Sequence, residues 1–151
     1  MIRIQTETFD PAILLGQFSE GRTDCGAVVS FTGLARAATN GEPVSNLELD
    51  AYPGFTEAAI EAMAAEARER FAVKDLIIVH RYGPIAPGDA IVFVAAAAEH
   101  RRAAFQAADF LMDKLKTQAP FWKKETGPKG ARWIEPRAPD YEDAARWSPN
   151  P

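Results

Sequence analysis

The sequence contains a single cysteine, Cys25, among its 151 residues. One thiol excludes a disulfide within the chain and a zinc site built from four cysteines. His80 and His100 do not form a metal-ligand spacing with the acids around them, so no metal site is expected. Such scarcity of cysteine is typical of a reducing compartment, and we expect Cys25 to be an inert thiol.

Long hydrophobic runs are also missing. The longest candidate, residues 90–98, is far shorter than the roughly 20 apolar residues that cross a bilayer. Residues 1–7 do not have the pattern of a signal peptide, so we expect a cytoplasmic protein. The glycines form neither a Walker A loop nor a G-x-G-x-x-G motif, and no serine stands in G-x-S-x-G. Neither phosphate-binding loops of these types nor a serine hydrolase is therefore indicated.

The composition that is present suits one folded domain, with 47% apolar and 25% charged residues. The formal net charge is −4, so any anion site must be a local concentration of lysine and arginine. We expect a single domain over residues 1–137. Residues 138–151 are rich in proline and charge, and we expect them to form a loosely held tail.

Hydrophobic periodicity predicts an α+β fold. Asp10 followed by Pro11 indicates a helix start, and Pro120 ends the last long helix. The expected helices cover residues 11–18, 56–71 and about 99–119, and the expected strands cover residues 2–6, 27–32, 44–52, 76–80, 90–97, 121–126 and 132–134. This order predicts helices packed on a mostly antiparallel sheet.

The most informative segment is residues 114–125, which holds four lysines within 11 positions of an acidic chain. Lys116 lies in the last helical turn before Pro120. Because side chains alternate along a strand, Phe121, Lys123 and Glu125 share one face, and Trp122 and Lys124 share the other. Lys116 and Lys123 can then converge on one pocket and bind an anion. The alternative is that lysines merely complement the negative end of a helix, which does not explain Lys123.

Two further basic positions stand at element ends. His100 and Arg101 lie in the first turn of a long helix, where free N–H groups suit a bound anion. Arg36 follows a buried strand and Gly33, which permits a ligand to approach the backbone closely. The alternatives are a solvated basic turn and an ordinary loop arginine.

Taken together, these segments resemble the MoaE family, the large subunits of molybdopterin synthase. The similarity covers roughly residues 20–137, and its most specific part is the lysine–proline–aromatic–lysine run. The motifs that carry it are residues 26–33 with Arg36, Tyr52-Pro53-Gly54, His80-Arg81 with Gly83, Pro87-Gly88-Asp89, residues 91–94, His100-Arg101 and residues 115–123. The sequence departs from the family at Ala35, where a larger aliphatic residue is common.

The resemblance implies an α/β hammerhead-type fold with an additional antiparallel β subdomain. It implies a homodimer that binds one small ubiquitin-like sulfur-carrier subunit at each end, giving a heterotetramer. The carrier's C-terminal Gly-Gly tail, as a thiocarboxylate, would supply sulfur to cyclic pyranopterin monophosphate. The implied activity is therefore a sulfurtransferase of molybdenum cofactor biosynthesis that forms the dithiolene of molybdopterin. No resident cofactor, nucleic acid or membrane is implied.

The resemblance also implies roles for individual residues. Lys116 belongs at the reaction centre, and Lys123 holds the pterin or its phosphate near the attacking sulfur. The phosphate clamp is Arg36 with His100 and Arg101, which act either in their own copy or across the dimer. The remaining expected substrate contacts are Leu34, Ala35, Lys124 and Glu125, and the expected pocket supports are Phe31, Met112 and Arg137.

Two other functions fit parts of the pattern. One is a non-catalytic anion- or RNA-binding module, in which Phe121 and Trp122 stack on bases beside Lys123 and Lys124. The acidic net charge and the lack of a long basic stripe argue against it. The other is a scaffold that binds the carrier without turnover, and the presence of both Lys116 and Lys123 argues against that.

Overall fold

The computed structural model describes residues 1–149 and has the predicted α+β architecture, with two four-stranded sheets and a small hairpin. The helices are α1 (Pro11–Ser19), α2 (Phe55–Phe71), α3 (Arg101–Gln118) and α4 (Ala138–Ala145). The strands are β1 (Ile2–Gln5), β2 (Ala27–Leu34), β3 (Ala38–Thr39), β4 (Glu42–Pro43), β5 (Asn46–Ala51), β6 (Asp75–Arg81), β7 (Gly83–Ile85), β8 (Ala90–Ala98), β9 (Phe121–Gly127) and β10 (Gly130–Ile134). Within residues 1–149, no helix is both long and apolar enough to pass through a bilayer.

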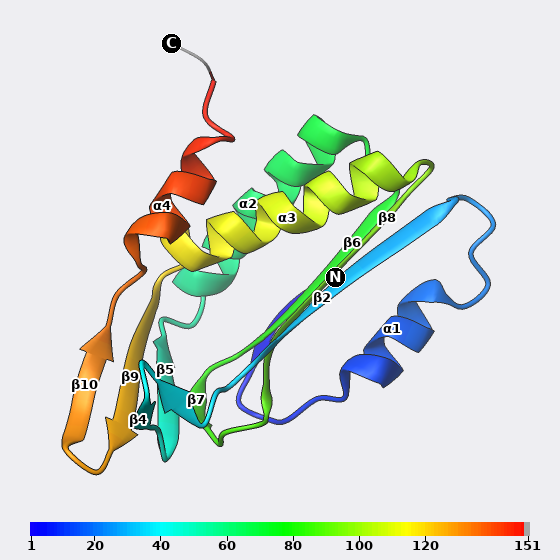
Figure 1. Cartoon of the computed structure of the whole chain (residues 1–151). Coiled ribbons are helices and arrows are strands. Elements are labelled where there is room, and N and C mark those ends of the chain that lie inside the picture. Colours follow the sequence, from blue (N-terminus) through cyan, green and yellow to red (C-terminus); the bar gives the residue numbers. More distant parts are fainter. Residues whose placement is uncertain (150–151) are drawn as a thin grey trace.

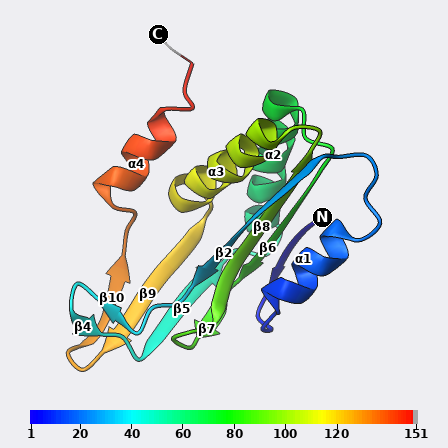
Figure 2. The same ribbon diagram turned by 45° about the vertical axis from the view of Figure 1, so that its right-hand side comes forward.

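The main sheet has the strand order β1-β6-β8-β2 and is covered on both faces by helices (Figures 1 and 2). Only the β1–β6 pair among these is parallel, so the expected antiparallel character is confirmed. Because alternate residues of a strand point to opposite faces, β6 and β8 divide their side chains between two cores. Ile77, Val79 and Phe93 pack against α1, whereas Ile78 and Val94 pack against α2 and α3.

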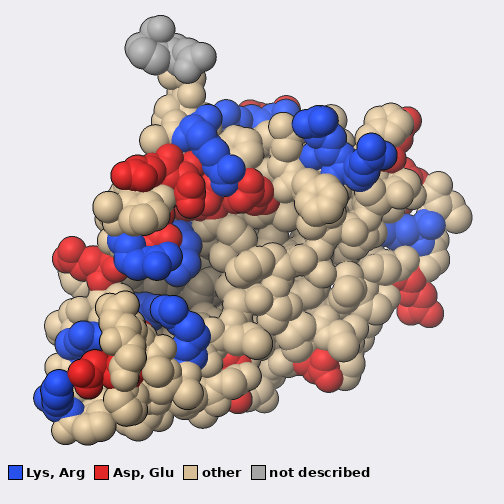
Figure 3. All heavy atoms as spheres, in the orientation of Figure 1, with Lys and Arg blue, Asp and Glu red and all other residues tan. Residues whose placement is uncertain are grey.

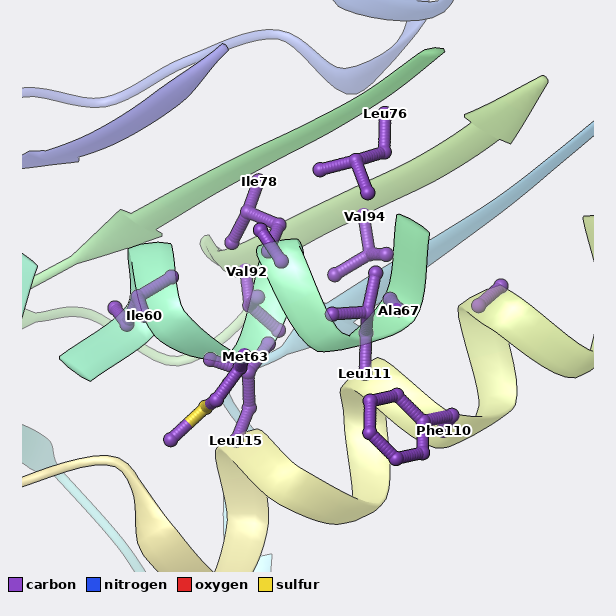
Figure 4. Close-up of a cluster of buried hydrophobic side chains, with 12 residues drawn as sticks. Ile60, Met63, Ala67, Leu76, Ile78, Val92, Val94, Phe110, Leu111 and Leu115 are labelled. Carbon is purple, nitrogen blue, oxygen red and sulfur yellow. The ribbon is translucent and has the colours of Figure 1, made fainter. Parts of the chain in front are cut away.

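The larger core lies between the sheet and the pair α2 and α3 (Figure 4). On α2, Ile60, Met63, Ala64 and Ala67 form a buried stripe, and Phe71 is half-buried. On α3, the buried stripe includes Ala104, Ala108, Leu111 and Leu115, while Met112 is half-buried. These contacts fix the direction of α3 and hence the point where it ends.

The second sheet has the order β10-β9-β5-β7, with every pair antiparallel, and corresponds to the additional β subdomain. The strands expected over residues 121–126 and 132–134 are confirmed as β9 and β10, which pair as a hairpin. Residues 34–43, which lie between two expected strands, contain the short hairpin β3–β4. Asn40 and Gly41 have φ values of 51° and 80°, as a tight two-residue hairpin turn requires.

The C-terminal segment corrects an expectation. Residues 138–149 do not form a loose tail, because they include α4 and the packed side chain of Trp147. Residues 150 and 151 of the expected tail lie outside the described part. The Trp147 ring packs edge-on against Phe71 and Phe110, with ring centroids 5.6 and 5.5 Å away. Its Nε1 donates to Asp113 Oδ2 at 2.6 Å, and Arg146 pairs with the same carboxylate at 2.7 Å. The composition of this segment predicts an exposed tail, because composition does not reveal contacts with residues that are distant in the sequence.

His80 is buried in β6. Its ring stacks on Phe121 with a centroid distance of 4.1 Å, and its Nδ1 lies 2.8 Å from the Arg81 carbonyl oxygen, to which it donates. Burial lowers the pKa of His80 from 6.5 to about 4, because a charged imidazolium would lose its hydration. His80 therefore joins the main core to the first residue of β9 as a neutral ring.

Acidification is expected to destabilise the fold through His80. The unfolded chain binds a proton near pH 6.5, while the folded chain does so only near pH 4. The neutral ring therefore makes its full contribution to the free energy of unfolding above pH 6.5. This contribution falls as the pH drops and is smaller by about 3 kcal/mol at pH 4. In His80→Asn, whose amide can keep the bond to the Arg81 carbonyl, this pH dependence should shrink by that amount. Urea unfolding at pH 7 and pH 4 measures it, and an unchanged difference between the two would refute the assignment.

Candidate functional site

The candidate site forms where α3 ends and β9 begins. Ala119 has an extended backbone, and Pro120 cannot continue the helix. The turn is fixed on both sides: the Thr56 hydroxyl donates to the Pro120 carbonyl at 3.2 Å, and Phe121 stacks on His80. Lys116, in the last turn of α3, and Lys123, on β9, are therefore presented from two elements that meet at one fixed corner.

Positive charge gathers at this corner. Burial lowers the pKa of Lys123, and the nearby charges of Lys116 and Arg36 lower it further, whereas Glu125 and Asp140 oppose the shift. These four charges therefore act on Lys123, and such interactions fade over about 10 Å in water. Figure 3 shows lysine and arginine side chains on both sides of a hollow below α4. The convergence of Lys116 and Lys123 on one pocket stays a prediction.

Glu125 is the counter-charge inside the cluster. Its side chain is 8% exposed, and its Oε1 accepts a hydrogen bond from the Thr39 hydroxyl at 3.0 Å. Lys123 Nζ lies 4.0 Å from the same oxygen, and Arg132 lies 3.6 Å from Oε2. A buried carboxylate needs such partners, since an isolated buried charge is costly. Glu125 thus binds Lys123 from within the sheet.

A second hollow, of about 390 Å³, runs along α3 beside β2. Phe31 and Met112, the predicted apolar supports, both line it together with Val29, Phe105 and Ala108. Met112 stands one helical turn before Lys116, so the apolar hollow leads toward the cationic corner. β2 is the edge strand of the main sheet, and Phe31 and Phe105 are exposed there.

Several predicted substrate contacts lie elsewhere. Lys124 is on the opposite face of β9, where its ammonium stands 5.4 Å from the centre of the Trp133 ring. Leu34 faces a different hollow beside α1, and Ala35 is buried against Leu47, Leu49 and Ile85. Arg137 is exposed at the start of α4, with its Nε 3.7 Å from Asp140. The structure therefore does not bring Lys124, Leu34 or Ala35 to the cluster.

His100 and Arg101 are exposed at the beginning of α3, and Lys116 is near its end. Lys116 follows Arg101 by 15 positions, which correspond to about 22 Å along a helix axis. One phosphate group spans only a few ångströms, which is far less than this separation. Whether His100 and Arg101 act in their own copy or across a dimer is not decided by one chain, and both forms stay predictions.

Two residues near the cluster were not predicted. Thr39 falls outside the expected strands, although Asn40-Gly41 is the dipeptide that signals a tight hairpin. Asp140 falls in the expected tail, yet its side chain is 12% exposed and it accepts from the Arg137 backbone N–H at 2.8 Å. No local pattern links Thr39 to Glu125 of β9, since that contact depends on the tertiary fold.

The arrangement does not support the stacking patch of the RNA-binding alternative. Phe121 packs inward on His80, and Lys123 faces the buried Glu125, whereas Trp122 and Lys124 face the other way. Trp122 is paired edge-on with Trp133 at a centroid distance of 6.2 Å. The four residues therefore do not form one continuous platform. The geometry instead suits small anions held at the end of α3.

Comparison with known proteins identifies similar chains. The family model described as MoaE protein matches residues 4–118. A curated relative named molybdopterin synthase catalytic subunit, from Caulobacter vibrioides, is 56% identical over 147 residues, covering 97% of each chain. A solved MoaE protein from Burkholderia ambifaria is 46% identical with a TM-score of 0.82, covering 97% of each chain. A solved molybdopterin synthase from Staphylococcus aureus is 31% identical with a TM-score of 0.79, covering 87% of this chain and 94% of that one.

Proposed function

The chain belongs to the MoaE protein family, and we propose that it performs the reaction for which the curated members are named, as the catalytic subunit of molybdopterin synthase. It is a sulfurtransferase of molybdenum cofactor biosynthesis. The observation that carries the proposal is the position of Lys123 at the end of α3, where its ammonium lies 4.0 Å from the buried Glu125 and feels the charges of Lys116 and Arg36. An acidic chain that gathers three cations in one place is suited to anionic reactants.

The sulfur would come from a partner. The word subunit in the names of the relatives points to a second chain, and the resemblance implies a small carrier that ends in a thiocarboxylate. A thiocarboxylate and a pterin phosphate are both anions, and they repel each other when brought close. The cationic corner offsets this repulsion, so the carrier tail and cyclic pyranopterin monophosphate can occupy it together.

The sulfur transfer then proceeds without any change of oxidation state. The thiocarboxylate sulfur attacks a substrate carbon that bears oxygen, the oxygen leaves as water, and a thioester joins carrier and pterin. Water cleaves the thioester, which releases the carrier carboxylate and leaves the sulfur on the pterin; a second round completes the dithiolene. Lys116 stabilises the oxyanion that develops at the thioester carbonyl, and Lys123 binds the substrate anion.

The phosphate clamp would be completed by a second copy of the chain. An isologous dimer places the same patch of both copies against itself. If the two α3 helices run antiparallel along the apolar hollow beside β2, Arg101 of one copy reaches the Lys116 end of the other. The exposed Phe31 and Phe105 would be covered in that contact. The homodimer thus accounts for the separation of Arg101 from Lys116 in one chain.

The direct test is a reconstituted reaction. The purified protein is mixed with thiocarboxylated carrier and cyclic pyranopterin monophosphate, and the product is oxidised to its fluorescent pterin derivative and quantified. We expect dithiolene formation that requires all three components, with two carriers consumed per product. A carrier that ends in an ordinary carboxylate is the matched control and should yield nothing. Absence of product with the thiocarboxylated carrier would overturn the proposed function.

A further inference from the structure

The hairpin β3–β4 is held rigidly over the hairpin of β9 and β10. Lys129 pairs with Glu42 at 3.1 Å, and the Ser45 hydroxyl donates to the Thr126 carbonyl at 3.0 Å. A side chain at Gly127 would collide with the Pro43 carbonyl oxygen, because its Cβ would stand 2.5 Å away. The backbone around Thr39 is therefore fixed in position relative to β9.

Thr39 uses this position to reach the interior of the site. Its hydroxyl donates to Glu125 Oε1 at 3.0 Å, across 86 residues of sequence. Among residues 1–149 this is the hydrogen bond that the Glu125 carboxylate receives, since Oε2 has none and the nearest cations stand at 3.6 and 4.0 Å. A hydrogen bond to a charged group contributes about 1.5–3 kcal/mol, so its loss is a large perturbation for a buried carboxylate.

We propose that Thr39 is a positioning residue for the sulfur transfer: its hydroxyl holds the Glu125 carboxylate in the orientation that keeps the Lys123 ammonium charged and directed at the substrate. This inference rests on the proposed function and adds a residue to it. Thr39 does not touch the reactants, and it acts through Glu125. Without the hydroxyl, the carboxylate is free to turn toward Arg132, which lies nearer the surface.

The charges around Lys123 determine the direction of the effect. Lys116 on α3 and Arg36 after β2 disfavour its charge, while Glu125 on β9 and Asp140 on α4 favour it; Arg132 on β10 competes for Glu125. The pKa of Lys123 is already lowered by burial and by these cations. Withdrawal of Glu125 lowers the pKa of Lys123 further, so the ammonium loses its proton at a lower pH.

The first measurement is kcat/KM against pH for Thr39→Val, which removes the hydroxyl and keeps the side-chain shape. We expect a fall of about tenfold near pH 8 and a shift of the alkaline limb toward lower pH. Thr39→Ser should restore both. Ser45→Ala is the matched control, since it removes a hydrogen bond of the same length from the same junction without reaching Glu125. An equal shift in Ser45→Ala, or none in Thr39→Val, overturns the proposal.

Two further measurements separate Thr39 from the rest of the site. In a Glu125→Gln background, Thr39→Val should change kcat/KM by less than about twofold, because residues that act through one partner are not additive; a full additional fall overturns the inference. The NMR titration of the Lys123 Cε signal, in protein with 13C-labelled lysine, needs no reaction. A lower titration midpoint in Thr39→Val supports the positioning role. This holds even if the wild type makes no product, a result that refutes only the proposed function. An unchanged midpoint overturns the inference about Thr39, whereas turnover by the wild type leaves the proposed function intact.

Discussion

Replacing Lys116 with alanine is expected to reduce product formation at least about a hundredfold while leaving carrier binding nearly unchanged. Lys116 lies in the last turn of α3 and its charge acts on Lys123, so we expect the thioester carbonyl of the carrier to lie beside it. A donor placed where oxyanion charge develops stabilises the transition state more than the ground state. The loss should therefore appear in kcat, and the Kd for the carrier should stay within about twofold.

Lys114→Ala is the matched control for this experiment. Lys114 is in the same helix, but its ammonium pairs with Glu66 at 3.5 Å and lies over the Phe110 ring, away from the cluster. It should retain turnover close to that of the wild type. Single-turnover assays with thiocarboxylated carrier, together with calorimetric titration of the carrier, distinguish the two variants. Full activity of Lys116→Ala would remove Lys116 from the reaction centre.

Mixing two inactive variants is expected to restore activity. If Arg101 serves the site of the second copy, a dimer of one Lys116→Ala chain and one Arg101→Ala chain contains one doubly altered site and one intact site. Such dimers should reach about half of the wild-type activity, since one of their two sites is complete. In a site formed within one chain, both sites of the mixed dimer would carry a defect, and no recovery would follow.

The mixed dimers are made by co-expression with two different affinity tags and purified over both columns. A dimer of Lys116→Ala with Lys116→Ala/Arg101→Ala is the control, because neither of its sites then has a lysine at position 116. Recovery in the control would mean that chains exchange or that contaminating enzyme is present. Failure of the first mixture to recover, with dimers verified by mass, would contradict the shared site and the antiparallel α3 contact.

The elements of the fold could be predicted largely from local patterns. The stripe on α2 and the alternation in β6 and β8 are periodic, and each gives a nearly complete account of which faces are buried. The opposite faces of Lys123 and Lys124 follow from the same alternation once Pro120 ends the helix. Local chemistry therefore predicts which side chains of β9 share a face, without any tertiary contact.

The contacts that complete the site depend on tertiary structure. Thr39 and Glu125 are 86 residues apart, and the sequence gives no sign that one binds the other. The same holds for Trp147, whose partners Phe71 and Phe110 lie on two different helices. The sequence also does not show whether Arg101 contributes to the site of its own copy or to that of a second copy. A helical pattern gives the length of α3 but no contact between copies. The resemblance implies that role, and the length of α3 is one reason for proposing that Arg101 acts across a dimer.

The docking of Trp147 on Asp113 has a consequence for the carboxyl end of the chain. Asp113 precedes Lys116 by three positions in α3, so the anchor and the reaction lysine occupy one turn of the same helix. Shortening the protein by its last few residues, whether by a protease or by a premature stop codon, would uncover Phe110 and leave Asp113 without the indole. We therefore expect removal of the C-terminal residues to disturb the turn of α3 that carries Lys116, although every residue expected to touch the reactants is still present.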